Sequence, residues 1–136
     1  MERIEDAGQL LALVWRDSDW KDGLSFPTPD ELFIQVGLWQ YPAGKKLKAH
    51  RHKHNARTVT RTQEGTYVKS GRMRVTIFGE AGHKVADFVL NAGDFAVMAA
   101  GGHAYEILEE RTQILEFKNG PFIDVKTDKE DIVSPA

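Results

Sequence analysis

Residues 64–78 read EGTYVKSGRMRVTIF, and this stretch decides the fold. In its second half apolar residues alternate with other residues, so Met73, Val75 and Ile77 share one face of an extended strand. The first half also has the composition of a strand, and Gly71 between the halves supplies the backbone freedom that a turn needs. The stretch therefore predicts two β-strands joined by a turn, with Met73, Val75 and Ile77 in the core.

Short apolar runs recur on both sides of this stretch, separated by Gly, Pro, Asn and Asp at intervals of roughly 8 to 12 residues. Patterns with the period of a helix are scarce. This spacing is typical of an all-β barrel or sandwich. The expected strands are 10–15, 33–41, 57–69, 72–78, 84–90, 94–99, 104–108 and 112–117.

Length and composition limit the classes of protein to which the chain can belong. The 136 residues are 41% hydrophobic and 28% charged, which indicates one folded domain over residues 1–136, with a core at about 33–122 and a polar tail at 123–136. The acidic amino terminus and the short apolar runs predict no secretory signal and no membrane span, so we expect a cytoplasmic protein. Because the chain has no cysteine, a metal would be held by His, carboxylate or amide ligands.

Charge is segregated along the chain. The segment 45–61 holds seven Lys or Arg and no Asp or Glu, which leaves 11 basic and 20 acidic residues elsewhere, a net charge of −9. Such a segment is either a solvated loop or a surface that attracts a small anion. The acidic remainder would repel a polyanion, so no nucleic-acid partner is expected.

Two motifs carry the candidate chemistry. Residues 44–52 read G-x5-H-x-H and residues 64–71 read E-x6-G, and Gly101-Gly102-His103 ends a later segment. These motifs resemble those of the cupin family, whose fold is a jelly-roll barrel of antiparallel strands, also called a double-stranded β-helix. By that resemblance, the metal ligands are His50, His52, Glu64 and His103. The implied cofactor is a divalent transition metal: iron, manganese, nickel, zinc or copper.

Two alternatives remain within the motifs. Eleven residues separate His52 from Glu64, where the cupin motif has three or four, so His54 competes with His50 as the second histidine of an H-x-H pair. Strand alternation places Glu64 on the face that points into the barrel. A register shift of one residue would place Gln63 there instead, because each single step along a strand exchanges the two faces.

A narrower resemblance covers most of residues 33–122. Segments 61–64, 68–75, 101–103 and 116–122 look like a group of small cupins common in bacterial surface-polysaccharide and nucleotide-sugar metabolism. It implies a metal-dependent enzyme, of isomerase or epimerase type, acting on a small anionic sugar or sugar-nucleotide derivative. The alternatives are a cupin-type oxygenase, a non-catalytic sugar- or metal-binding regulatory module, and a metal-free barrel whose histidines act as acid and base.

Three residues are candidates for moving a proton in such a reaction. Glu64 is the motif carboxylate, and Tyr105 shares a strand face with His103. Glu116 interrupts an apolar strand, so it either pairs with an inward-facing Lys or Arg, acts as an acid or base, or lies on an edge. We also expect a homodimer, in which the apolar strand 10–15 is exposed and available for exchange.

Overall fold

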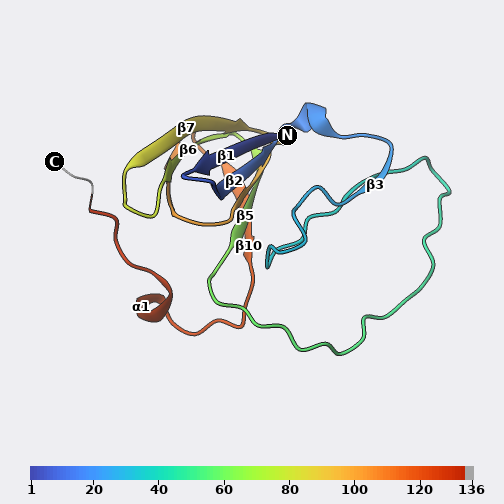
Figure 1. The fold of residues 1–136 in the computed structure, drawn as a ribbon. Coiled ribbons are helices and arrows are strands. Elements are labelled where there is room, and N and C mark those ends of the chain that lie inside the picture. Colours follow the sequence, from blue (N-terminus) through green and yellow to red (C-terminus); the bar gives the residue numbers. More distant parts are fainter. Residues whose placement is uncertain (134–136) are drawn as a thin grey trace.

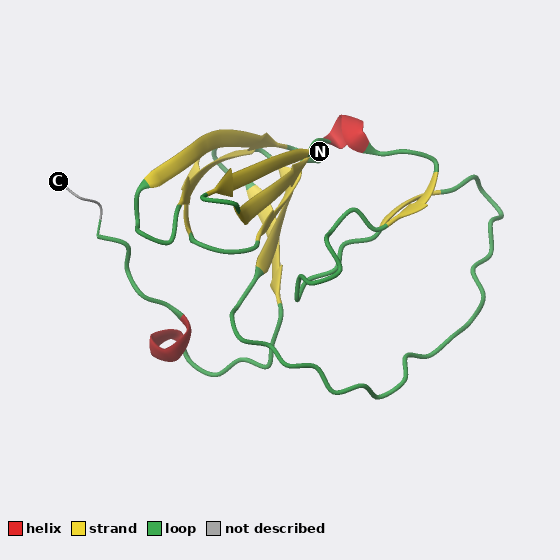
Figure 2. Ribbon diagram, in the orientation of Figure 1, coloured by secondary structure: helices red, strands yellow, loops and turns green. Residues whose placement is uncertain are grey.

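A computed structural model describes residues 1–133 of the chain, so the end of the predicted tail, 134–136, lies outside the described residues. The described part is built from antiparallel strands with almost no helix, as predicted (Figures 1 and 2). No helix in residues 1–133 is long and apolar enough to cross a membrane. The strands are β1 (Glu2–Asp6), β2 (Gln9–Trp15), β3 (Gly23–Ser25), β4 (Leu38–Gln40), β5 (Glu64–Ser70), β6 (Arg72–Phe78), β7 (Lys84–Asn91), β8 (Phe95–Met98), β9 (Gly102–Ile107) and β10 (Gln113–Lys118), with a 3-10 turn at Asp17–Asp19 and a short helix, α1, at Val125–Asp128.

The strands form three sheets. The largest has the order β1-β2-β8-β5-β10, the second β7-β6-β9, and β3 pairs with β4 alone. The predicted turn at Gly71 joins β5 of the first sheet to β6 of the second, so it forms a corner between sheets. Gly71 is required there because its φ is +81° and an added Cβ would collide with Thr112.

The main core lies between the five-stranded and three-stranded sheets. Met73, Val75 and Ile77 are buried in it, which confirms the face predicted from their alternation. They meet side chains of the five-stranded sheet, which come from β2, β5 and β8. We call the surfaces that face this core the inner faces of the two sheets. Its buried members are Leu11, Ala12, Val14, Val68, Met73, Val75, Ile77, Leu90, Ala96 and Met98.

A second, smaller core covers the outer face of the five-stranded sheet. Leu13 and Trp15 of β2 and Val97 of β8 pack there against residues from the segment 32–38. Strand β2 is thus buried on both faces, and it pairs with β1 on one side and β8 on the other. The expectation that strand 10–15 is exposed is therefore wrong, because β1, which sequence alternation did not reveal, covers its edge.

The predicted strands 33–41 and 57–69 form only in part. Regular strand is present at β4 and β5, and no residue between these strands is in a helix or strand. Every residue from 42 to 62 is exposed, and Figure 1 shows this stretch as a wide loop that runs away from the sheets. We call residues 41–62 the arm. Its dense positive charge and scarce apolar residues give it little to bury against its own chain.

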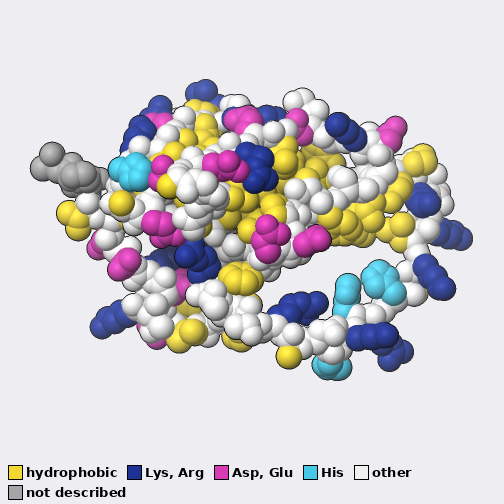
Figure 3. All heavy atoms as spheres, in the orientation of Figure 1, with side chains coloured by type: hydrophobic (Ala, Val, Ile, Leu, Met, Phe, Trp, Pro, Cys, Tyr) yellow, Lys and Arg dark blue, Asp and Glu magenta, His cyan; other side chains and the backbone are white. Residues whose placement is uncertain are grey.

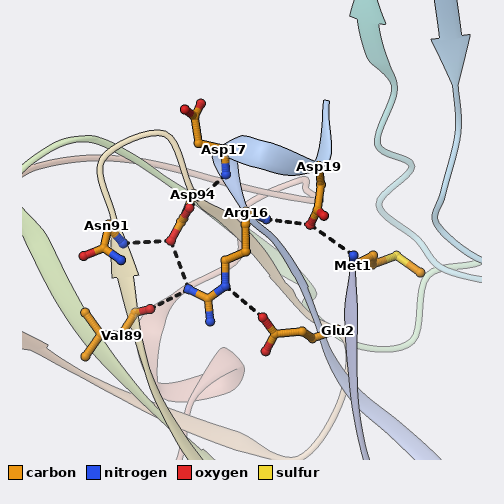
Figure 4. A network of polar contacts seen from close by, with 8 residues as sticks. All are labelled: Met1, Glu2, Arg16, Asp17, Asp19, Val89, Asn91 and Asp94. Carbon is orange, nitrogen blue, oxygen red and sulfur yellow. Dashed lines mark hydrogen bonds and ion pairs between the residues drawn. The ribbon is translucent and has the colours of Figure 1, made fainter. Parts of the chain in front are cut away.

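An ion pair between the buried Asp94 and the partly buried Arg16 fixes one end of the five-stranded sheet (Figure 4). The carboxylate of Asp94 accepts hydrogen bonds from Arg16 Nη1 and from the backbone amides of Asp17 and Asn91, each at 2.9 Å. Arg16 Nη1 also donates to the carbonyl of Val89, at 2.6 Å. The network ties the end of β2 to the turn between β7 and β8, and so links the two sheets.

We expect Asp94→Ala to lower the free energy of unfolding by at least about 2 kcal/mol, because the substitution leaves Arg16 and two amides without their acceptor. Denaturant unfolding measures this loss. The control is Asp87→Ala, which removes a more exposed carboxylate paired with Lys84 and should cost under about 1 kcal/mol. Equal losses in the two variants would contradict a structural role for the Asp94 network.

Candidate acid–base site

The site begins with Glu64, the first residue of β5. Its direct cross-strand neighbours are Met98 of β8 and Lys118 of β10. Direct neighbours in an antiparallel pair share one face of the sheet, and Met98 belongs to the main core. Glu64 and Lys118 therefore face the inner side of the five-stranded sheet, as predicted for Glu64.

The opposite sheet supplies an imidazole and a phenol. His103 and Tyr105 alternate along β9 and lie opposite Ile77 and Val75 of β6, which are both core residues. The side chains of His103 and Tyr105 therefore point from the three-stranded sheet toward Glu64. Their ring centroids are 5.0 Å apart, which confirms that they share a face.

Both groups contact the same oxygen of Glu64. The hydroxyl of Tyr105 donates a hydrogen bond to Oε1 at 2.7 Å, and Nε2 of His103 lies 2.8 Å from it. On the other oxygen, Lys118 Nζ lies 3.6 Å from Oε2. Glu64 is only 5% exposed, so this carboxylate is buried with three donors around it.

These contacts determine the protonation of the cluster. Burial by itself would raise the pKa of Glu64, but hydrogen bonding to His103 and Tyr105 outweighs it and lowers the pKa to about 2. Burial and the adjacent Glu64 raise the pKa of Tyr105, so the phenol stays protonated and donates. At neutral pH Glu64 is therefore an anion that can only accept hydrogen bonds.

The ionised Glu64 in turn determines the tautomer of His103. An anionic oxygen 2.8 Å from Nε2 requires a proton on that nitrogen. Neutral His103 therefore keeps Nδ1 as its basic nitrogen. Because its side chain is 29% exposed, the imidazole can be reached from solvent.

Glu116 and Lys118 form an ion pair beside this cluster. They are two residues apart on β10, and Lys118 Nζ lies 3.0 Å from Glu116 Oε1. The hydrogen bond to Glu116 raises the pKa of Lys118, so the amine stays charged. Two of the alternatives for Glu116 hold together: it pairs with Lys118, and it is exposed on β10, which is an edge strand within residues 1–133. Glu116 lies opposite Thr66, whose buried hydroxyl has no hydrogen-bond partner within residues 1–133.

The structure does not bring the three histidines of the arm to this cluster. His50, His52 and His54 are all exposed, with the rings of His50 and His52 5.3 Å apart. Of the five predicted metal ligands, only Glu64 and His103 meet. In the described part of the chain, no three His, Cys, Asp or Glu side chains are placed to hold a metal ion. As arranged here, the residues do not fit a complete metal site, and the ligand set stays a prediction.

Gln63 has a structural role on the side of the strand away from the site. Its Oε1 accepts hydrogen bonds from the amides of Phe33 and Ile34 at 2.7 and 3.3 Å, and its Nε2 donates to the carbonyl of Ala99 at 3.0 Å. The alternative in which Gln63 replaces Glu64 at the site is therefore not what the structure shows. Gln63 instead anchors the end of the arm to the sheet.

A cavity of about 460 Å³ lies on the outer face of the five-stranded sheet. No Asp, Glu, His, Lys or Arg contributes to its lining, so it offers apolar surface without acid–base groups. Phe95 and Phe117 stack there at 5.6 Å, and Phe117 lies against Gly65, where an added Cβ would be 2.5 Å from its ring. The cavity lining includes five aromatic side chains and two leucines: Trp15, Trp20, Tyr67, Phe95, Phe117, Leu38 and Leu115.

Two members of the cluster were not predicted from the sequence. Lys118 follows Glu116 by two residues, and strand alternation could have placed both on one face. Thr66 shares the face of Glu64, but its unpaired hydroxyl is a property of tertiary packing alone.

Comparisons of the chain with known protein families, with curated proteins and with solved structures found no match.

The low pKa of Glu64 makes its contribution to stability dependent on pH. The folded-state pKa of about 2 lies below the ordinary value of 4.5, so this stability is fully present above about pH 4.5 and is lost as the pH falls toward 2. The contribution amounts to about 3 kcal/mol.

In the variant Glu64→Gln the side chain at position 64 does not ionise, so the variant should not lose this stability as the pH falls. The difference in unfolding free energy between the wild type and the variant should therefore narrow as the pH is lowered from about 5 to about 2. Denaturant unfolding at a series of pH values measures it. Parallel pH profiles of the two proteins would show that Glu64 is not the low-pKa group.

Proposed function

We propose that this protein is a small cupin-type enzyme that moves a proton on a small anionic sugar or sugar-nucleotide derivative, as an isomerase or epimerase does. The observation that carries the proposal is the contact of His103 and Tyr105 with the buried, ionised Glu64. A carboxylate that holds an imidazole in one tautomer is a recurrent arrangement for general base catalysis. The resemblance of the motifs to those of sugar-processing cupins supports the substrate class.

In this mechanism His103 is the base. Its Nδ1 takes the proton from a carbon next to a carbonyl group, and the electron pair left behind moves onto the carbonyl oxygen. The positive charge that forms on the imidazole is stabilised by Glu64 at Nε2. For an isomerisation, the hydroxyl on the deprotonated carbon passes its proton to the former carbonyl oxygen, and His103 returns its proton to the former carbonyl carbon. For an epimerisation, water reprotonates the same carbon on its opposite face, and the imidazole gives its proton to the hydroxide that forms.

The other residues of the site orient His103 and provide a cation for the substrate. Glu64 is a weak base at a pKa of about 2, so it orients His103 rather than taking the substrate proton itself. Tyr105 holds the Glu64 carboxylate through its hydroxyl. Lys118 remains cationic and partly exposed beside the cluster, which suits an anionic substrate group, while Glu116 holds its amine in place.

Exchange of substrate hydrogen with solvent tests this function without knowledge of the product. In D₂O the protein should replace a C–H hydrogen next to the carbonyl or anomeric carbon in at least one member of a panel of sugar phosphates and nucleotide sugars. Proton NMR measures the loss of that signal. We expect His103→Gln and Glu64→Gln each to slow the exchange by about a hundredfold or more.

The matched control is Glu106→Gln. Glu106 lies on the same strand as His103 and Tyr105 but on its outer face, where it pairs with Arg74 at 2.6 Å. This variant should exchange at the wild-type rate. No exchange with any member of the panel would contradict a proton-transfer enzyme of this substrate class and favour a non-catalytic binding module.

The second candidate function is metal binding by His50, His52, Glu64 and His103, with His54 as the alternative histidine. It is favoured by two observations: Glu64 and His103 already meet, and the arm that carries the histidines ends two residues before Glu64. The nine residues between His54 and Glu64 can span roughly 30 Å, so an arm that folds over could bring imidazoles to the cluster. An oxygenase remains the alternative reaction for such a site.

Metal content tests this second candidate. Elemental mass spectrometry of the untagged protein should find close to one iron, manganese, nickel, zinc or copper ion per chain. The ion should be lost in the double variant His50→Ala, His52→Ala and retained in His83→Ala, which removes an exposed histidine paired with Asp6. A protein that takes up no such metal after reconstitution, or a double variant that retains it, would contradict this ligand set.

A further inference from the structure

The two strands that border the acid–base site both have a free edge. Within residues 1–133, β10 ends the five-stranded sheet and β9 ends the three-stranded sheet, and each pairs on one side only. Apolar side chains are exposed along both: Leu115 is 59% exposed, Phe117 38% and Ile107 55%. A free edge with exposed apolar side chains is a template for the addition of another strand.

The hairpin that precedes the arm is also incomplete. β3 and β4 have three residues each and pair only with one another, and such a small two-stranded sheet is at best marginally stable alone. Leu24, Phe26 and Trp39 are each about half exposed on this hairpin and the loop beside it. Apolar side chains gathered on one surface of a folded chain indicate contact with a partner.

The charges of the arm and of the remainder of the chain are complementary. The segment 45–61 has seven basic and no acidic residues, while the other residues have a net charge of −9. Figure 3 shows the Lys, Arg and His side chains spread along the arm, and Asp and Glu side chains on the rest of the described chain, which we call the body. A second copy of the chain therefore presents the acidic surface that the arm of the first copy complements.

The arm does not cover the free edges of its own chain. It leaves the hairpin after Gln40 and meets its own chain again at its last residues, where Arg61 pairs with Glu80 at 3.0 Å and the hydroxyl of Thr62 contacts Asp128. All residues between 42 and 62 are exposed, and the space-filling view shows much of the arm standing away from the body (Figure 3). Within residues 1–133, the polar contacts that tie the arm to the rest of its own chain lie at its carboxyl-terminal end.

We infer that the protein forms a homodimer in which the hairpin and arm of each copy, residues 23–62, lie along the free edge of β10 in the other copy. The exposed Leu24, Phe26 and Trp39 then cover Leu115 and Phe117, and the basic arm passes over the partner copy, whose residues outside its own segment 45–61 have a net charge of −9. The segment has 40 residues, so it is long enough to supply the roughly 20 to 30 residues per side of a stable interface. The dimer does not depend on the proposed reaction.

Mass and hydrogen exchange together test the dimer on the full-length protein. Light scattering should give twice the chain mass of 15.3 kDa. In the dimer, hydrogen–deuterium exchange should be slow in peptides from 38–62 and 113–118. Leu115→Lys should give the mass of one chain and speed exchange in both regions by about tenfold or more, with an unchanged circular dichroism spectrum.

Two further variants keep the test decisive. Ile123→Lys makes the same change at another exposed aliphatic residue, outside the arm and β10, and should leave the dimer intact. Trp39→Lys, on the hairpin, should dissociate it as Leu115→Lys does, so the result does not depend on one variant folding.

Three outcomes would overturn the inference. The first is a wild-type mass of one chain at every concentration measured. The second is a dimer in which the arm exchanges as fast as an unfolded peptide, which would place the interface on another surface. The third is slow exchange of the arm in a single chain, which would show that the arm folds onto its own body.

Discussion

The packing of the five-stranded sheet on the three-stranded sheet is the constraint on which the site depends. The chain changes sheets at Gly71, so β5 and β6 face one another across the main core. The alternation that buries Val68 and Ile77 also turns Glu64 and the β9 residues into the same interior. The acid–base cluster is thus the polar continuation of the hydrophobic core, held at the distances that the sheet packing sets.

A buried carboxylate is unfavourable unless donors compensate for the lost water. Around Glu64 the compensation comes from one residue on β10 and two on β9, Lys118, His103 and Tyr105. The same contacts that make the anion tolerable also lower its pKa and select the tautomer of the imidazole. Stability and the proposed chemistry therefore rest on one set of interactions.

The body and the arm differ in what they bury. The body has two hydrophobic cores and the Asp94 network, whereas residues 42–62 bury no side chain of their own. The predicted strands at 33–41 and 57–69 are correspondingly short, because a strand needs a partner and the arm pairs with neither free edge, β9 or β10, of its own sheets. The histidine motif lies in this unpaired part, and the metal set therefore stays a prediction.

The sequence by itself determined the all-β class, the positions of the central strands and the inward face of β6, because these follow from the period-two pattern within single strands. For β5 it favoured the face of Glu64 but left a one-residue shift to Gln63 open, and the structure decided between them. The resemblance to cupin motifs predicted that Glu64 and His103 would meet, and strand alternation placed Tyr105 on the face of His103. Only the tertiary structure decided that β2 is buried on both faces, that Lys118 joins the cluster and that the arm stands apart. Those features depend on which strands become neighbours, and contacts between distant segments leave no periodic pattern in the local sequence.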